Sequence, residues 1–251
     1  MDLQLLNEEC LITSFGRHAK TYPLYAQLQQ SMASKLANYL PSSLPENVLE
    51  IGCGTGHFTR HLLSLPTQNL ILNDIASAML KSLSETLILP NNAKLYSGNA
   101  ERIQFHDIDL ICANAVFQWF QEPLDTLKKL RQSLTNGGSI IFSTFGPKTL
   151  KEFRDIANIE SPIEFHDHEA WIGMLKDAGF TLKTSDVEIR KLYYSNTLSF
   201  LQNLQQLGAS PLRMTTTGKL RKILRDYDLN YSTQQGVYAN WEIYYFSMVL
   251  D

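Results

Sequence analysis

Residues 48–56 read Val48-Leu49-Glu50-Ile51-Gly52-Cys53-Gly54-Thr55-Gly56. A short, mostly apolar segment typical of a buried β-strand runs into a turn with alternating glycines, and a helical pattern follows over 58–65. Glycine lets the backbone approach a ligand closely, and the free N–H groups at a helix start attract polar ligands. The stretch therefore predicts a strand, turn and helix unit that binds a cofactor.

Short apolar segments alternate with helical patterns along the rest of the chain, as in a parallel sheet built from βαβ units. The further predicted strands are 70–72, 95–96, 110–113, 139–142, 180–190 and 241–250. Both faces of the last one are apolar, so we expect it inside the sheet. Helices are predicted at 124–134, ending at Asn136-Gly137-Gly138, and at 170–178. The fold class is α/β and Rossmann-like, with a seven-stranded, mostly parallel sheet and helices on both faces.

Two further segments are expected to cover the site. Residues 192–237 separate the last two predicted strands, which is far longer than a hairpin loop, and contain helical patterns at 197–206 and 217–227. The N-terminal segment to about Leu40 is also helical. We predict a single domain over 1–251, with an N-terminal lid (about 1–40) and an inserted cap (about 192–237).

The composition of the 251 residues, with 44% hydrophobic and 19% charged, is that of a globular protein. The first residues carry acids where a signal peptide carries bases, and no apolar run could cross a bilayer, so we expect a cytoplasmic protein without membrane contact. Three cysteines without CxxC spacing predict neither a disulfide framework nor a zinc ribbon. The net charge of -3 argues against a nucleic-acid binder.

Other residues extend the glycine turn into a cofactor site. Asp74 ends the second predicted strand, where an acid accepts both ribose hydroxyls, and Ile75 would border the adenine. Glu50 would repel a pyrophosphate but suits the cationic end of an amino acid. A nucleoside joined to an amino acid indicates S-adenosyl-L-methionine (SAM). The predicted cofactor-binding residues are Glu50, Gly52, Gly54, Gly56, Asp74, Ile75, Asn99, Ala100 and Asn114. The alternative is that the glycines form only a tight turn and Asp74 only caps the next helix.

The family resemblance rests on two segments at the edge of the sheet where open α/β folds bind ligands. Asn-Ala-Val-Phe-Gln-Trp at 114–119 and Phe-Ser-Thr-Phe-Gly-Pro-Lys-Thr-Leu-Lys-Glu at 142–152 resemble the malonyl-acyl-carrier-protein O-methyltransferases of biotin biosynthesis. Residues 14–22, 207–209 and 241–245 also resemble that family. The resemblance implies a class I SAM-dependent methyltransferase that methylates the free carboxylate of a malonyl thioester, with malonyl-loaded acyl carrier protein or malonyl-CoA as partner.

The implied reaction needs no strong base, because a carboxylic acid is already ionised at neutral pH and catalysis can rest on positioning. A sulfonium cation and a carboxylate lose their charges together, so a dry pocket with neutral donors favours the transition state. We predict Tyr22 and Gln118 as catalytic groups that orient the carboxylate, Trp119 and Phe145 as apolar walls, and Arg213 as a carboxylate or phosphate contact. The alternative for Tyr22 and the other aromatic residues is packing in the core.

Two charged segments allow more than one interpretation. Residues 166–169, His-Asp-His-Glu, look like a metal cluster but adjoin a helix start that they can cap, so we predict no metal site. Five basic residues gather in the cap, which favours an acidic carrier protein as partner, although a solvated helix face is the alternative. They are Arg213, Lys219, Arg221, Lys222 and Arg225.

Two other functions stay open. One is a SAM-dependent carboxyl methyltransferase for a free small acid, such as an aconitate-like substrate. The other is a SAM-binding partner protein without turnover, although the intact glycine turn favours an enzyme.

Overall fold

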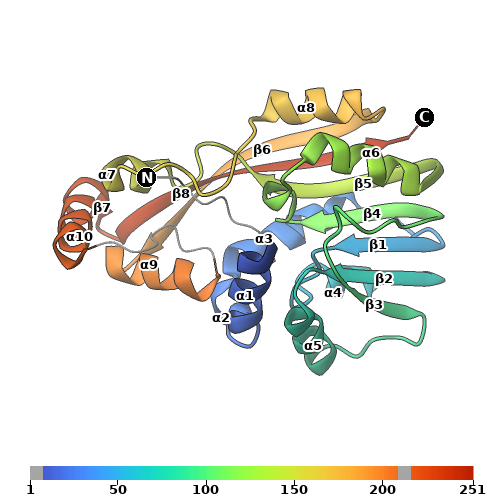
Figure 1. The fold of residues 1–251 in the computed structure, drawn as a ribbon, viewed down its shortest axis with the longest axis horizontal. Helices are drawn as coiled ribbons and strands as arrows, with labels where there is room; N and C mark the ends of the chain where they lie inside the picture. The colour runs from blue at the N-terminus through green and yellow to red at the C-terminus, as the bar shows by residue number, and fades with distance from the viewer. Residues whose placement is uncertain (1–7, 209–215, 251) are drawn as a thin grey trace.

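The computed structural model of the protein describes residues 8–208 and 216–250 (Figure 1). These residues form an eight-stranded sheet with the order β3-β2-β1-β4-β5-β8-β6, and the short β7 pairs with β8. Strands β1 to β5 are parallel, whereas β8 runs antiparallel to β5 and to β6. The strands are β1 (Asn47–Ile51), β2 (Asn69–Asp74), β3 (Ala93–Ser97), β4 (Ile108–Asn114), β5 (Leu134–Phe145), β6 (Thr181–Tyr194), β7 (Ser232–Thr233) and β8 (Gly236–Val249). The predicted fold class and the internal position of the last strand are confirmed, and the two-residue β7 is additional to the seven strands predicted.

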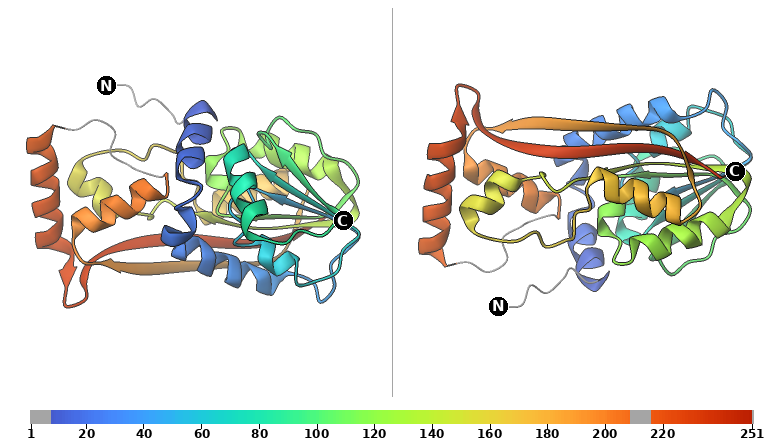
Figure 2. Two further views of the ribbon diagram at one scale, coloured as in Figure 1. Left: turned by 90° about the horizontal axis from the view of Figure 1, so that it is seen from below. Right: turned by 90° about the horizontal axis from the view of Figure 1, so that it is seen from above.

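Helices cover both faces of the sheet (Figure 2). Successive residues of a strand point to opposite faces, so Val48 packs in one core cluster and Leu49 in the other. The first cluster includes Met32 and Leu80, and the second includes Leu127. The helices are α1 (Glu8–His18), α2 (Tyr22–Tyr25), α3 (Gln27–Leu36), η1 (Ala37–Tyr39), α4 (Thr59–Leu62), α5 (Ser77–Thr86), η2 (Phe117–Trp119), α6 (Pro123–Ser133), α7 (Lys151–Ala157), α8 (His168–Asp177), α9 (Thr197–Gln206) and α10 (Thr217–Tyr231).

Two predicted helices next to the parallel strands have other bounds in the structure. The helix expected to end at residues 136–138 ends at Ser133, because Leu134 already pairs with Ile108 in the sheet. The positive φ of Gly137, +75°, therefore falls within β5. The helix after β1 is also shorter than predicted and spans only Thr59–Leu62.

The β6–β8 hairpin extends past the parallel strands. Pairing between β5 and β8 ends at Ile243, whereas pairing between β6 and β8 continues to Tyr194 and Val237. This extension carries α9, whose bounds match the prediction, and α10, which is longer than predicted. In Figure 1 these helices lie at one end of the molecule and the parallel strands at the other, with α1 and α2 between them.

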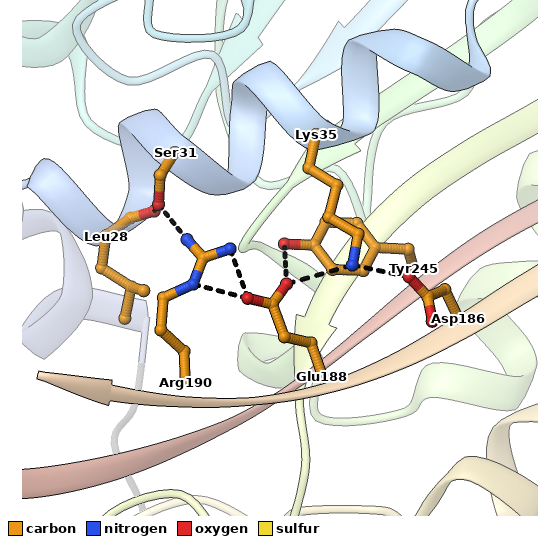
Figure 3. A network of polar contacts seen from close by, with 7 residues as sticks. All are labelled: Leu28, Ser31, Lys35, Asp186, Glu188, Arg190 and Tyr245. Carbon is orange, nitrogen blue, oxygen red and sulfur yellow. Dashed lines mark hydrogen bonds and ion pairs between the residues drawn. The ribbon is translucent and has the colours of Figure 1, made fainter.

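A network of charged residues holds α3 on the extended hairpin (Figure 3). Lys35 Nζ lies 2.5 Å from a carboxylate oxygen of Asp186 and 3.1 Å from one of Glu188. Arg190 pairs with Glu188 and donates a hydrogen bond to Ser31 Oγ. Desolvation by burial lowers the pKa of Lys35, but the hydrogen bonds to Asp186 and Glu188 act in the opposite direction, and the pKa is raised. The network therefore ties α3 to the hairpin that carries α9 and α10.

Residues 166–169 belong to the start of α8. Asp167 is the N-cap, and its side chain accepts a hydrogen bond from Ala170 N–H at 2.8 Å, while the His168 ring stacks on Phe246. Across 8–208 and 216–250, no three potential metal-ligating side chains gather. In the same ranges, no helix has the length and apolar character needed to cross a membrane.

Candidate active site

A pocket of about 860 Å³ lies at the carboxyl ends of β1, β2, β3 and β4. Ligands bind at this edge in open α/β sheets. The predicted cofactor-binding residues that line it are Gly52, Gly54, Asp74, Ile75, Asn99, Ala100 and Asn114. Glu50 and Gly56 are not among its lining residues.

The three glycines of the turn do different things. All have positive φ, which favours glycine. A Cβ added at Gly54 would meet no atom within 4 Å, so the space beside it is open to a ligand. A Cβ at Gly52 would collide with Val116, and one at Gly56 would lie 2.5 Å from Leu87. Gly54 thus permits close approach of a ligand, whereas Gly52 and Gly56 permit close packing of the protein itself.

Asp74 is buried and fixed by the backbone. Its carboxylate accepts hydrogen bonds from Gly54 N–H at 2.9 Å and from Ala76 N–H at 2.8 Å. Burial raises the pKa of Asp74 to about 6, although both hydrogen bonds act in the opposite direction. The side chain is therefore mostly ionised at neutral pH and has lone pairs left for the hydroxyls of a ribose.

Glu50 is buried at the end of β1, behind the turn. Its carboxylate accepts a hydrogen bond from Thr59 Oγ1 at 2.7 Å, from the first residue of α4. Burial raises the pKa of Glu50 to about 8, and the Thr59 hydrogen bond opposes that rise. A cation bound near the turn would lower this pKa and favour the ionised form.

Asn99 and Asn114 both join the pocket to the N-terminal helices. Asn99 Nδ2 donates to Glu8 Oε2 of α1 at 3.1 Å. Asn114 Nδ2 donates to the carbonyl oxygen of Gln29 in α3 at 3.0 Å, and its Oδ1 accepts from Ser143 Oγ at 2.8 Å. The N-terminal helices therefore close one side of the cofactor pocket.

A second pocket of about 790 Å³ adjoins the first. The two share four lining residues, Phe15, Tyr22, Ala115 and Trp119. The predicted acceptor residues that line the second pocket are Tyr22, Gln118, Trp119 and Phe145. Arg213, predicted as a substrate contact, lies outside the described residues. We call the second space the acceptor pocket.

Tyr22 and Trp119 form the junction between the pockets. The ring of Trp119 packs edge to face on that of Phe15, with 5.5 Å between the ring centroids. Tyr22 Oη has no hydrogen-bond partner within 8–208 and 216–250. Burial raises the pKa of the Tyr22 hydroxyl, and the negative charge of Asp74 raises it further. Tyr22 is therefore a neutral donor with capacity for a ligand.

Gln118 is buried and already makes two hydrogen bonds. Its Nε2 donates to the Ala115 carbonyl oxygen at 2.6 Å, and its Oε1 accepts from Thr144 Oγ1 at 3.2 Å. Ala115 has a φ of +57°, which is strained for a residue with a side chain. Gln118 thus supports the backbone between the pockets and has one Nε2 hydrogen left for a ligand.

Arg154 of α7 was missed by the sequence interpretation. Among the described residues that line the acceptor pocket it is the charged one. Its guanidinium donates to the carbonyl oxygens of Thr149 and, at 2.6 Å, of Pro147, and it lies 5.6 Å from the Phe165 ring. The only sequence signal is its position two residues after the segment that carries the family resemblance.

Comparison with known proteins identifies the family. Residues 24–185 match the methyltransferase domain family. A malonyl-[acyl-carrier protein] O-methyltransferase of Priestia megaterium is 28% identical, with 97% of this chain and 98% of the relative covered. Proteins with the same name from Ilyobacter polytropus (30% identity, 93% and 94% covered) and Bacteroides thetaiotaomicron (32%, 82% and 80%) also match.

Solved structures agree with this assignment at the level of the fold. The YcgJ protein of Bacillus subtilis has a TM-score of 0.66 at 14% identity, covering 88% of this chain and 98% of that one. A phosphoethanolamine N-methyltransferase 2 of Haemonchus contortus, solved with SAM, has a TM-score of 0.54 at 16% identity, covering 89% and 52%. The chain is a SAM-dependent methyltransferase and belongs to the family of malonyl-[acyl-carrier protein] O-methyltransferases.

Proposed function

We propose that this enzyme methylates the free carboxylate of a malonyl thioester on acyl carrier protein, in the cytoplasm, to give the malonyl methyl ester that enters pimeloyl synthesis for biotin. The names of the relatives support this substrate. The observation that carries the proposal is the junction of the cofactor and acceptor pockets at Tyr22, Ala115 and Trp119. SAM supplies an electrophilic methyl group, which would reach the acceptor through this junction.

Apolar and neutral groups at the junction suit the reaction. Trp119 and Phe15 at the junction, and Phe145 in the acceptor pocket, are apolar walls that would exclude water from the meeting point of two opposite charges that both disappear. Tyr22 donates a hydrogen bond to one carboxylate oxygen and leaves the other free to attack. A neutral donor stabilises the ionised reactant less than a cation does. Less stabilisation is therefore lost when the carboxylate charge disappears in the transition state.

Arg154 is assigned to the thioester end of the acceptor. A direct ion pair with the carboxylate would stabilise the reactant more than the transition state. Two of its N–H groups are used by Pro147 and Thr149, so others remain for the thioester carbonyl oxygen. Its positive charge also attracts the acceptor, which is an anion until it is methylated.

Carrier binding is assigned to the basic face of α10, defined by Lys219, Arg221, Lys222 and Arg225. All four are exposed. Arg225 pairs with Asp226 at 2.9 Å, whereas the other three make no ion pair with any described residue. Acyl carrier proteins are acidic, so this face is complementary to the proposed partner.

A panel of acceptors tests the proposed function. Methyl transfer from labelled SAM is measured with malonyl-acyl carrier protein, malonyl-CoA, malonyl-pantetheine, free malonate and aconitate. We expect the malonyl thioesters to react, the carrier-bound one with the highest kcat/KM, and mass spectrometry to locate the methyl group on the carboxylate. Faster reaction of a free acid would favour the small-acid methyltransferase. SAM binding without turnover on any acceptor would favour a binding protein.

A further inference from the structure

Glu8 of α1 reaches into the cofactor pocket from outside the sheet. Its Oε2 accepts from Asn99 Nδ2 at 3.1 Å and lies 3.0 Å from Arg102 Nη2. Both Glu8 and Asn99 line the pocket. A carboxylate from the N-terminal lid therefore meets the loop after β3 at the wall of the cofactor site.

The strand order identifies which end of SAM lies there. Since the order is β3-β2-β1-β4, the loop after β3 and Asn114 at the end of β4 lie at opposite ends of the pocket. Asp74, at the end of β2, is assigned to the ribose. The amino-acid part then points toward Asn114, and the adenine lies beside Asn99 and Glu8.

Adenine presents a 6-amino group that needs a hydrogen-bond acceptor when it is buried. Two of the nearby acceptors are already engaged. Asn99 Oδ1 accepts from Glu101 N–H at 2.9 Å, and the carbonyl oxygen of Gly98 accepts from Asn73 Nδ2 at 3.0 Å. Glu101, another lining residue, accepts from the N–H groups of Gln121 and Glu122 through Oε1 only, so its Oε2 is the competing acceptor to Glu8.

Glu8 Oε1 is available as a hydrogen-bond acceptor. Both contacts of Glu8 use Oε2, and Oε1 makes no hydrogen bond with any described residue. We propose that Glu8 Oε1 accepts a hydrogen bond from the 6-amino group of SAM, so that the lid helix α1 selects adenine over a 6-oxo purine. Asn99 and Arg102 position the carboxylate for this contact. Closure of α1 and recognition of the base are then one event.

The test compares two ligands by calorimetry, with no acceptor present. S-adenosylhomocysteine carries the 6-amino group, whereas S-inosylhomocysteine carries an oxygen there, which would repel the Glu8 carboxylate. We expect the native enzyme to prefer the adenine ligand. In Glu8→Gln, the Asn99 amide donor holds the glutamine oxygen and directs the glutamine NH2 at the base, so the preference should fall on the order of tenfold.

Glu9→Gln is the matched control, because Glu9 is exposed on the same helix and does not line the cofactor pocket. It should leave both affinities unchanged. If Glu8→Gln weakens both ligands equally, Glu8 only docks the lid and the proposal is wrong. An unchanged preference in Glu8→Gln, with loss of preference in Glu101→Gln, would assign the base contact to Glu101 instead. Since the readout is binding, it is independent of the acceptor and of the proposed function.

Discussion

The carboxylate of Asp74 accepts a hydrogen bond from the backbone N–H of Gly54 at 2.9 Å. This contact joins the end of β2 to the turn after β1, so the proposed ribose acceptor and the glycine that admits the ligand form one rigid unit. Burial of the carboxylate, which raises its pKa to about 6, makes the same unit sensitive to acid.

We predict that SAM binds more weakly as the pH falls through about 6. The ionised carboxylate of Asp74 accepts hydrogen bonds from ribose hydroxyls, whereas the protonated form loses acceptor capacity. Well below pH 6, Kd should rise by up to about tenfold per unit. Calorimetry between pH 5 and 8 measures this. Asp74→Asn should bind weakly without this pH dependence, and a native profile in that variant would contradict the assignment.

In the cofactor-free protein, Glu50→Gln should raise the stability of the fold only at high pH. Burial raises the pKa of Glu50 from 4.5 to about 8, so the folded state holds a proton that the unfolded state has lost. The contribution of the protonated Glu50 side chain to the free energy of unfolding is complete below pH 4.5 and is lost as the pH rises through 8. At pH 9 the variant should melt a few degrees higher than the native protein, and at pH 5 about equally. Exposed Glu46→Gln is the control, and equal shifts at both pH values would refute this account.

Tyr22→Phe should lower kcat by about one order of magnitude or more while leaving the Kd for SAM nearly unchanged. The hydroxyl has no partner among the described residues, so its removal costs the fold little and removes a contact made only to the acceptor. Tyr25→Phe, on the same helix and away from both pockets, is the matched control. Native turnover of Tyr22→Phe with saturating malonyl thioester would show that Tyr22 only packs.

Arg154→Met should raise KM for malonyl-pantetheine by about tenfold and leave SAM binding unchanged. Arg154 also donates hydrogen bonds to the carbonyl oxygens of Pro147 and Thr149. A raised KM in Arg154→Met alone would therefore not distinguish a lost contact to the acceptor from a disturbed loop. Arg154→Lys separates the two roles, because lysine keeps the charge but not the planar fork. Partial recovery of KM in Lys supports attraction of the anionic acceptor. Equal defects in both variants would assign Arg154 to bracing the loop.

The parts of the fold and site that the sequence predicted depend on local patterns. Short apolar runs marked the strands of the sheet, since buried parallel strands are apolar on both faces. That Gly52, Gly54 and Asp74 line one pocket could be predicted because they follow predicted strands, and the carboxyl ends of parallel strands meet in space.

The missed residues reach the site from elements whose placement no local pattern reveals. Glu8 and Arg154 come from helices that approach the sheet from outside, and Asn99, the partner of Glu8, is 91 residues away in the chain. The spacing around Gly137 was ambiguous between a helix end and an irregular strand, and pairing of Leu134 with Ile108 decided it. That Gln118 holds Ala115 also could not be read from sequence, because it depends on a strained backbone.

The basic face of α10 should govern binding of the carrier protein but not the chemistry. Its four cations are exposed, while Ile223 and Tyr227 bury the other side of the helix, so charge reversal should leave the fold intact. Replacing Lys219, Arg221, Lys222 and Arg225 with Glu should raise KM for malonyl-acyl carrier protein by at least about tenfold and reduce its dependence on salt, because charge complementarity speeds encounter and salt screens it.

The same variant should methylate malonyl-pantetheine nearly as the native enzyme does, because that acceptor lacks the carrier's acidic surface. The control variant has the same change in net charge as the α10 variant. It replaces four exposed lysines outside α10 with Glu, namely Lys81, Lys94, Lys128 and Lys183. If this control raises KM for the carrier-bound acceptor as much, net charge rather than the basic face of α10 guides the carrier. Equal losses on both acceptors in the α10 variant would mean that the helix shapes the acceptor pocket, and its melting temperature distinguishes that outcome from unfolding. Only a defect confined to the carrier-bound acceptor and to α10 supports a docking surface.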